Sequence, residues 1–164
     1  METQRLVLTK VNKNDAGFIF ELLNSPGWIN FIGNRNIETI DDALAYIQKI
    51  TNNPATDYWT VKLKDQQTPI GVVTFIKREY LECHDIGYAF LPQFGKQGYA
   101  YEASKKLLDE MSSDHKKIMA TVLKNNTSSI QLLGKLGMQF EKEIVVDDES
   151  LMLYSISTHN NKQP

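Results

Sequence analysis

Apolar and polar residues alternate at positions 5–11, and this period of two is typical of a half-buried β-strand. Residues 14–24 carry an apolar stripe at helical spacing behind an Asn/Asp start. Residues 39–50 repeat the helical spacing, with Thr39 as a candidate N-cap and two aspartates in the first turn. The stretch SPGW at 25–28 predicts a break between these two helices.

The middle of the chain predicts consecutive strands. Residues 58–64 and 69–78 are β-rich segments joined by the polar DQQT, which predicts a hairpin, and residues 84–91 predict a third strand. The remaining pattern predicts a helix at about 98–112, a β-branched strand at 117–123, a helix at about 127–136 and two closing strands around DDES at 147–150.

This order of elements is typical of an α+β domain with one mixed sheet. The third strand, the helix after it and the strand at 117–123 form a βαβ unit, whose two strands should be parallel and whose crossover should be right-handed. Ligand sites in such units lie beyond the carboxyl ends of the strands, and the segment PQFGKQGYA at 92–100 falls there.

Length and charge narrow the expected partners. The 164 residues suit one domain, spanning 1–164, with a polar tail at 158–164 that we expect to be frayed. The 18 basic and 20 acidic residues give a net charge of -2 without a block of like charge, so nucleic acid is not an expected partner. The chain opens without an apolar signal core and has no stretch near the roughly 18 apolar residues of a membrane span, so we expect a cytoplasmic protein without a membrane partner.

Cysteine and histidine are sparse. Cys83 is the single cysteine, which excludes an intrachain disulfide, and the three scattered histidines provide no metal-ligand spacing. We therefore expect no metal site.

The segment LPQFGKQGYAYEA at 91–103 is the candidate ligand-binding feature. Gly95 and Gly98 allow the backbone to turn before a helix whose first N–H groups have no partners within the helix. These donors and the positive end of the helix dipole favour an anion, and Lys96 adds a positive charge, so the segment suits a phosphate or pyrophosphate. The alternative is a glycine turn that only starts the helix.

Two other glycine motifs do not fit this segment. A Walker loop needs a glycine where Phe90 stands and a hydroxyl after Lys96, where Gln97 stands. A dinucleotide fingerprint follows the first strand of its fold with G-x-G-x-x-G spacing, whereas these glycines come after several strands.

A second segment, TVLKNNTSSIQLLGKLGMQF at 121–140, completes a pattern with the first. Together they resemble the GNAT superfamily of acyl-CoA-dependent N-acetyltransferases, whose loop follows [Q/R]-x-x-G-x-[G/A] and whose next helix begins with N-x-x-S and ends in K-L-G-[F/M]. The matching residues are Gly95-Lys96-Gln97-Gly98-Tyr99-Ala100, followed by Glu102-Ala103, and Asn126-Thr127-Ser128-Ser129 with Lys135-Leu136-Gly137-Met138. The segments at 3–24, 58–75 and 84–92 resemble the RimJ/RimL-type branch, so the resemblance covers about residues 3–157.

The resemblance implies a fold and a cofactor. The fold is a single mixed, mostly antiparallel β-sheet with helices on both faces, and the co-substrate is acetyl-CoA. The strand at 84–91 and the strand at 117–123 are implied to splay apart, with the pantetheine arm in the gap and a backbone N–H near residues 88–90 at the carbonyl oxygen. The residues implied to bind acetyl-CoA are Phe90, Leu91, Gly95, Lys96, Gln97, Gly98, Tyr99, Ala100, Asn126 and Ser129. Asn126 can also act simply as the N-cap of the last helix.

Acetyl transfer to an amine needs a base, because an alkyl amine is mostly protonated near neutral pH. Asp85 is the candidate base, directly or through a water, with Glu82 as the alternative and a solvated strand carboxylate as the plainer interpretation. Many GNAT enzymes carry a tyrosine acid on the last helix, but Leu133 stands there, so Ser129 or water must serve the leaving thiolate. Cys83 as an acyl carrier is a minor alternative. Glu102 is expected to orient the loop or the substrate.

Three residues depart from the family pattern. Gly95 stands where Gln or Arg is usual, and Lys96 stands where glycine is frequent, so the affinity for the cofactor is not implied by the resemblance. Gly134 replaces a common Glu and should cost about 1 kcal/mol of helix stability relative to Ala.

The expected acceptor is a primary amine, and the branch resemblance favours a peptide or ribosomal-protein N-terminus. Amino acids, polyamines and aminoglycoside-like amines are alternatives, as are a non-catalytic acyl-CoA-binding module and a nucleotide-binding regulator. The segments at 26–34 and 145–150 could line the acceptor site, although a solvated hairpin tip also explains the acidic residues of the second. A homodimer is a weak expectation from the frequency of two-fold oligomers.

Overall fold

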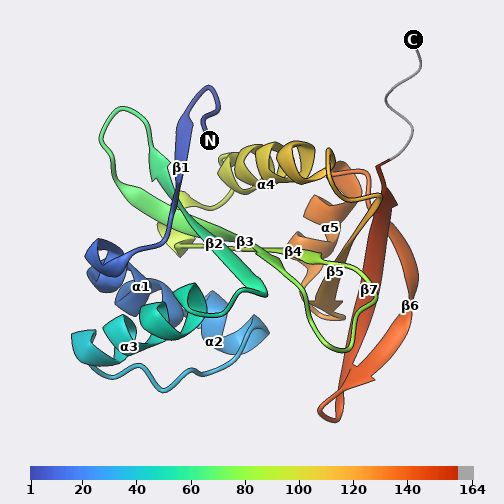
Figure 1. The fold of residues 1–164 in the computed structure, drawn as a ribbon, viewed down its shortest axis with the longest axis horizontal. Coiled ribbons are helices and arrows are strands. Elements are labelled where there is room, and N and C mark those ends of the chain that lie inside the picture. The colour runs from blue at the N-terminus through green and yellow to red at the C-terminus, as the bar shows by residue number, and fades with distance from the viewer. Residues whose placement is uncertain (159–164) are drawn as a thin grey trace.

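A seven-stranded sheet forms the centre of the computed structural model, which describes residues 1–158 (Figure 1). Its strands are β1 (Leu6–Lys10), β2 (Thr56–Leu63), β3 (Pro69–Ile76), β4 (Asp85–Phe90), β5 (Lys117–Leu123), β6 (Gln139–Val146) and β7 (Glu149–Ser157). Their order across the sheet is β1-β2-β3-β4-β5-β7-β6, and every neighbouring pair except β4 and β5 is antiparallel. The predicted mixed, mostly antiparallel sheet is confirmed.

The parallel pair at the middle of the sheet is short. Asp85 and Met119 are the paired positions of β4 and β5, and the Met119 amide donates to the His84 carbonyl at 2.9 Å. Within residues 1–158 the two strands pair nowhere beyond this point, so they diverge toward their carboxyl ends. The sheet therefore opens a gap between β4 and β5, as the resemblance implied.

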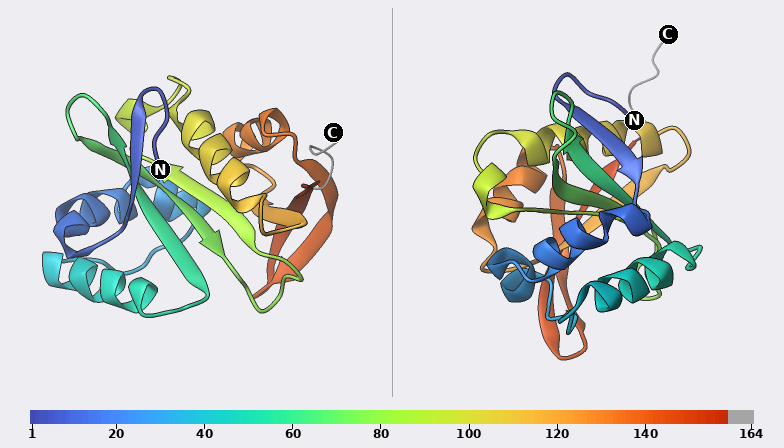
Figure 2. Two further views of the ribbon diagram at one scale, coloured as in Figure 1. Left: turned by 45° about the horizontal axis from the view of Figure 1, so that its top comes forward. Right: turned by 90° about the vertical axis from the view of Figure 1, so that its left-hand side faces the viewer.

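Helices cover both faces of the sheet. One face carries α1 (Ala16–Leu23), α2 (Pro26–Phe31) and α3 (Ile40–Thr51), and the opposite face carries α4 (Tyr99–Met111) and α5 (Thr127–Lys135) (Figures 1 and 2). Each layer has its own apolar core. Leu107 of α4 and Leu133 of α5 pack with sheet residues on one side, and Leu22 of α1 and Ile47 of α3 pack with Val72 on the other. Fully burying such a side chain contributes about 1.5–3 kcal/mol, which fixes the helices on the sheet.

The N-terminus of α3 agrees with its sequence signal. The Asp42 amide donates to Thr39 Oγ1 at 3.1 Å, and the Thr39 amide donates to Asp42 Oδ2 at 2.9 Å. This reciprocal capping satisfies two backbone donors that the helix leaves free. Thr39 is thus the N-cap, as predicted.

The SPGW segment differs from the prediction. A break does follow α1, but α2 begins at once, with Ser25 at the N-cap position and Pro26 in the first turn. Proline suits the first helical turn because its fixed φ is helical and its missing N–H has no partner there. With six residues, α2 is too short to show a helical period, and its Trp28 is buried against α1 and α3 residues.

The carboxyl end of the described chain is attached to the sheet. The Thr158 amide donates to the Lys116 carbonyl at 2.9 Å, so the first residue of the predicted frayed tail is held in place. Residues 159–164, the rest of that tail, lie outside the described residues. Among residues 1–158, none of the helices has the length and apolar character that crossing a bilayer requires.

Candidate active site

The loop between β4 and α4 has an unusual backbone. A short 3-10 turn, η2 (Pro92–Phe94), leads into Gly95, and two left-handed residues follow, Lys96 at φ 58 and Gly98 at φ 81. The predicted need for glycine is confirmed at Gly98, because a positive φ is unfavourable for side chains with a Cβ. Gly95 has an ordinary φ of -68, so the left-handed turn falls on Lys96 instead.

The amides of residues 96–101 are free. None of these six N–H groups has a hydrogen-bond partner within residues 1–158. They belong to the left-handed turn and to the first turn of α4, where backbone donors and the helix dipole converge. These free donors and the positive charge of Lys96, which lines a cavity at this loop, are suited to an anion such as a phosphate group.

Glu102 anchors this loop from behind. Its Oε1 accepts from Thr3 Oγ1 at 2.5 Å and from the Arg5 amide at 2.9 Å, and its Oε2 accepts from Arg5 Nε at 2.7 Å. Burial alone would raise the pKa of Glu102, but these hydrogen bonds outweigh it and hold the pKa below its usual value. Arg5 Nη1 then donates to the Gln97 carbonyl at 3.0 Å. Glu102 therefore orients the loop through Arg5 and is not directed at a ligand.

The N-terminus of α5 lies opposite the loop. Asn126 Oδ1 accepts from the Ser129 amide at 3.4 Å, which confirms its expected capping role. The Tyr88 hydroxyl of β4 donates to the Ser129 carbonyl at 3.0 Å, and burial raises the pKa of this hydroxyl to about 12. The first turn of α5 is thus tied to the strand across the gap.

The open edge of β4 faces the same gap. The Leu91 amide donates to the Ile70 carbonyl of β3 at 2.9 Å, so Leu91 faces β3. Because hydrogen bonding alternates along a strand, the amides of Tyr88 and Phe90 face the gap. These are the backbone donors in the region from which the oxyanion contact was expected.

Two cavities meet at this gap. The loop cavity, of about 440 Å³, lies between the 94–101 loop and the start of α5, and the strand cavity, of about 450 Å³, extends between β4 and β5 toward the carboxyl end of β3. Both are lined by Tyr88, Ala89, Asn126 and Ser129.

Most of the predicted cofactor residues line the loop cavity. They are Phe90, Gly95, Lys96, Gly98, Tyr99, Ala100, Asn126 and Ser129. Leu91 and Gln97 do not line it: Leu91 is buried in the core with its amide bonded to β3, and the carbonyl of Gln97 is held by Arg5. Tyr99, expected to be freer for a ligand, carries the Arg5 guanidinium 4.4 Å from its ring centre.

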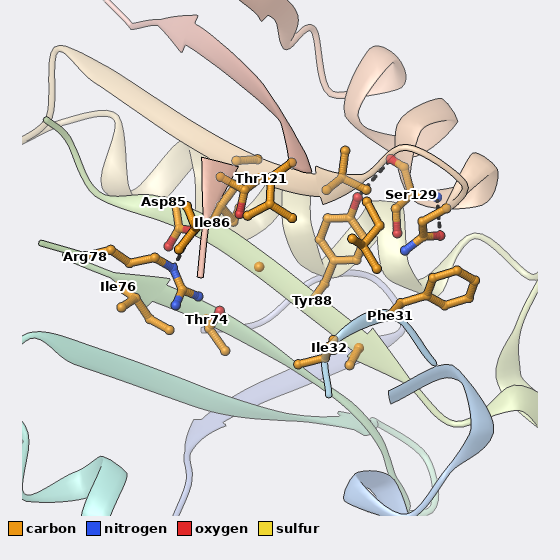
Figure 3. A pocket seen from close by; sticks show the side chains of 18 of the residues that line it. Phe31, Ile32, Thr74, Ile76, Arg78, Asp85, Ile86, Tyr88, Thr121 and Ser129 are labelled. Atoms are coloured by element: carbon orange, nitrogen blue, oxygen red, sulfur yellow. Dashed lines mark hydrogen bonds and ion pairs between the residues drawn. The ribbon is translucent and has the colours of Figure 1, made fainter. Parts of the chain in front are cut away.

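Asp85 lies in the strand cavity, at the end away from Ser129 (Figure 3). Its side chain is buried, its Oδ2 accepts from Arg78 Nε at 2.8 Å, and its Oδ1 has no partner within residues 1–158. Burial raises the pKa of the Asp85 carboxyl, and the Arg78 guanidinium offsets part of that shift. The solvated strand carboxylate considered from the sequence is excluded by this burial.

The other candidates from the sequence lie elsewhere. Glu82 pairs with Lys117 at 2.7 Å on the surface, and Cys83 packs beside Leu81 and Met119 outside both cavities. Leu133, in place of the family tyrosine, is buried and lines the strand cavity. Within residues 1–158 no group of three or more His, Cys, Asp or Glu side chains is placed to hold a metal ion.

Two site residues were missed from the sequence. Arg78, after β3, was assigned only to a strand end, and Tyr88 was considered only for its backbone. Alternation along β4 offered one signal for Tyr88. Residues three positions apart point to opposite faces of an ideal strand, so the side chain of Tyr88 is expected on the face opposite to that of Asp85. No local signal pairs Arg78 with Asp85.

The sequence matches the family described as Acetyltransferase (GNAT) domain over residues 5–139, which is most of the chain. The protein belongs to the GNAT acetyltransferase family. It is therefore an acetyl-CoA-dependent N-acetyltransferase, as predicted, and the loop cavity with its free amides and Lys96 has the donors that the pyrophosphate of acetyl-CoA requires.

Individual relatives agree with the family. The GNAT chain is 28% identical over 148 residues to the uncharacterized N-acetyltransferase YoaA of Bacillus subtilis, covering 86% of this chain and 83% of YoaA. Its fold is similar to that of the spermidine N-acetyltransferase of Vibrio cholerae, solved with CoA and spermine, at a TM-score of 0.81 and 19% identity over 95% of this chain and 97% of that one. It is also similar to the ribosomal-protein-S5-alanine acetyltransferase of Vibrio fischeri, at a TM-score of 0.80 and 19% identity over 99% and 98%. At these identities the solved structures establish the GNAT fold.

Proposed function

We propose that this GNAT enzyme transfers the acetyl group of acetyl-CoA to the primary amine of a peptide or protein N-terminus held in the strand cavity. One observation carries the proposal: a cavity with free backbone donors meets a cavity with a buried, half-unpartnered carboxylate, and the two join at Tyr88 and Ser129. An activated acyl group and a basic group can thus approach an amine from two sides.

The loop cavity would hold the cofactor. The amides of residues 96–101 and the Lys96 ammonium would bind the pyrophosphate, and the exposed edge of Phe90 with the side chain of Asn126 would position the pantetheine arm. Bound acetyl-CoA supplies an acetyl thioester, whose carbonyl carbon accepts the amine nitrogen.

Asp85 is proposed to accept the proton of the acceptor amine through a water. Asp85 and Tyr88 are three positions apart along β4, a span of roughly 10 Å at the usual strand rise, so Asp85 is too far from the junction to hydrogen-bond an amine there directly. Burial raises the pKa of the Asp85 carboxyl and so increases its basicity, and the Arg78 guanidinium offsets part of that shift.

The junction provides the remaining groups. The amides of Tyr88 and Phe90 face the gap and are proposed to stabilise negative charge on the carbonyl oxygen. Ser129 lines both cavities, and its hydroxyl is proposed to deliver a proton to the leaving thiolate, directly or through water.

The peptide acceptor follows from the RimJ/RimL-type segments of the sequence, and the similarity in fold to a ribosomal-protein acetyltransferase supports it. A small amine is the second candidate, supported by the similarity in fold to the spermidine enzyme. A cytoplasmic homodimer completes the proposal, and light scattering of the purified protein tests the assembly.

Thiol release from acetyl-CoA, measured with a panel of peptides, amino acids and polyamines, tests this function. We expect turnover on peptide N-termini, and Asp85→Asn should lower kcat/KM about 10²–10⁴-fold, as loss of a general base does, without changing acetyl-CoA affinity. Asp65→Asn, in the exposed β2–β3 turn, is the matched control. Turnover confined to small amines would mean that the acceptor is a small amine and not a peptide N-terminus. Full activity of Asp85→Asn would show that Asp85 is not the base.

A further inference from the structure

The guanidinium of Arg78 is only partly used. Its Nε donates to Asp85 at 2.8 Å, and its charge and a side-chain hydrogen bond also act on the nearby Tyr80 hydroxyl, whose pKa they lower against the larger effect of burial. The side chain is 36% exposed, and Figure 3 shows its guanidinium pointing into the strand cavity on the side of Thr74. The amino groups of a guanidinium form a planar fork that matches a carboxylate, and Asp85 accepts only from Nε.

A second cation lies on the same cavity. Arg35, in the segment between α2 and α3, is exposed, lines the strand cavity and has no ion-pair partner within residues 1–158. Tyr58 lines the same cavity, and burial and the neighbouring Tyr46 raise the pKa of its hydroxyl, while Arg78 and Arg35 both lower it. Thr74 also lines this wall, and the Tyr58 hydroxyl shares a hydrogen bond with the Tyr46 hydroxyl at 3.3 Å.

Acidic groups also line the cavity. Asp85 uses one oxygen for Arg78, and Asp147 and Glu149 lie at the turn between β6 and β7. The cavity is therefore lined by charges of both signs, with Arg35 contributed by the segment between α2 and α3 and Arg78 by the segment after β3. A polycation would meet the two arginines there, whereas an acceptor with one amine and one carboxylate could satisfy both signs.

We propose that the acceptor carries a carboxylate in addition to its reacting amine, and that Arg78 with Arg35 binds that carboxylate. This proposal rests on the function proposed above, since it places the acceptor in the strand cavity. The guanidinium lies beside Asp85, roughly 10 Å along β4 from the junction at Tyr88, so the carboxylate is several bonds away from the amine. An acidic side chain in the first two residues of a peptide has this reach, whereas the α-carboxylate of a free amino acid is closer to its amine.

Matched acceptors test the proposal. Thiol release is measured for the peptides Ala-Glu-Ala-Ala and Ala-Gln-Ala-Ala as C-terminal amides, for Glu and Gln at the first position, and for free amino acids beside their amides. A charge-assisted pair should favour the glutamate peptides by about tenfold or more in kcat/KM, mainly through KM. Preference for free amino acids over their amides, without preference among the peptides, would assign the carboxylate to the α position.

Variants test the assigned cations. Arg35→Gln and Arg78→Lys should each reduce the ratio of kcat/KM for the glutamate peptide to that for the glutamine peptide by several-fold, and Arg78→Lys keeps a positive charge beside the buried Asp85. Lys124→Gln, which removes a surface cation paired with Glu143 outside both cavities, should leave the ratio and the activity unchanged.

The outcomes separate the two proposals. Equal turnover of acids and amides by the wild-type enzyme, or an unchanged ratio in both arginine variants, overturns the carboxylate site and leaves the acetyltransferase function intact. If no amine is turned over, the proposed acceptor fails. Calorimetric titration of the CoA-loaded protein with N-acetylated Ala-Glu-Ala-Ala and Ala-Gln-Ala-Ala then tests whether the carboxylate site exists. Tighter binding of the glutamate peptide would support the site, and equal or absent binding would overturn it.

Discussion

Tyr88 is the residue on which the geometry of the junction depends. Its hydroxyl donates to the Ser129 carbonyl at 3.0 Å and joins β4 to α5 across the gap. Because burial raises the pKa of this hydroxyl to about 12, Tyr88 stays neutral and keeps its donor throughout the pH range in which amines are assayed. We therefore expect Tyr88 to position Ser129.

We predict that Tyr88→Phe lowers the free energy of unfolding by about 1 kcal/mol, because a part-buried hydrogen bond is lost. It should also lower kcat more than it raises the KM for acetyl-CoA, because loss of this hydrogen bond displaces Ser129, the proposed proton donor. Chemical denaturation and thiol-release kinetics measure the two effects. Tyr154→Phe, a core tyrosine whose hydroxyl has no hydrogen bond within residues 1–158, is the control and should change both quantities little. Equal behaviour of the two variants would contradict the role of Tyr88.

At the scale of elements, the loop before α4 and the helix α5 place opposite demands on glycine. Gly98 has φ 81, and a Cβ there would lie 3.3 Å from Arg5 Nη2. Gly134 lies in α5 with nothing within 4 Å of an added Cβ. The same substitution should therefore have effects of opposite sign.

Gly98→Ala should lower the free energy of unfolding by about 1–2 kcal/mol, the cost of a left-handed residue with a Cβ, and should weaken acetyl-CoA binding by disturbing the free amides. Gly134→Ala should raise the free energy of unfolding by up to about 1 kcal/mol, because alanine has the higher helix propensity, and should leave acetyl-CoA affinity unchanged. Urea denaturation and calorimetric titration of both variants provide the comparison. Similar shifts in both would mean that the backbone conformation at Gly98 does not control the loop.

At the scale of the whole molecule, stability in acid depends on the place where β4 and β5 still pair. The His84 carbonyl accepts from the Met119 amide there, and the His84 ring stacks on Phe75 at 4.7 Å and lies 4.6 Å from the His115 ring. Burial, then the nearby His115 and Lys77, lower the pKa of His84 below its model-peptide value of 6.5. Protonation of His84 is thus less favourable in the folded protein than in the unfolded chain.

The sign of the pH effect follows from this difference. The contribution of His84 is fully present above pH 6.5, the value of the unfolded chain, and is lost as the pH falls through the lower value of the folded protein. We predict that the free energy of unfolding falls less steeply below pH 6.5 in His84→Gln than in the wild type, measured by urea denaturation between pH 5 and 8. Parallel curves for the two proteins would refute the contribution, because the carboxylates are common to both.

Periodicity and local chemistry were sufficient for most of the secondary structure. The stripes of α1 and α3, the hairpin of β2 and β3 and the capping threonine of α3 depend on neighbours within a few residues, so their signals are present in the sequence. The six-residue α2 was missed because its period cannot be detected over so short a span and because proline was interpreted only as a break.

The sequence by itself determined the family, the alternation of strands and helices, and the order of the motifs at residues 95–100 and 126–129, because these are local patterns of residue type and spacing. Tertiary structure alone decided which side chains meet. It paired Arg78 with a buried Asp85, tied Tyr88 to Ser129, and assigned the left-handed turn to Lys96 rather than to Gly95. The reason is physical: the pKa of a carboxylate and the partners of a guanidinium depend on burial and on residues from other elements, and neither is set until the strands diverge and the helices pack.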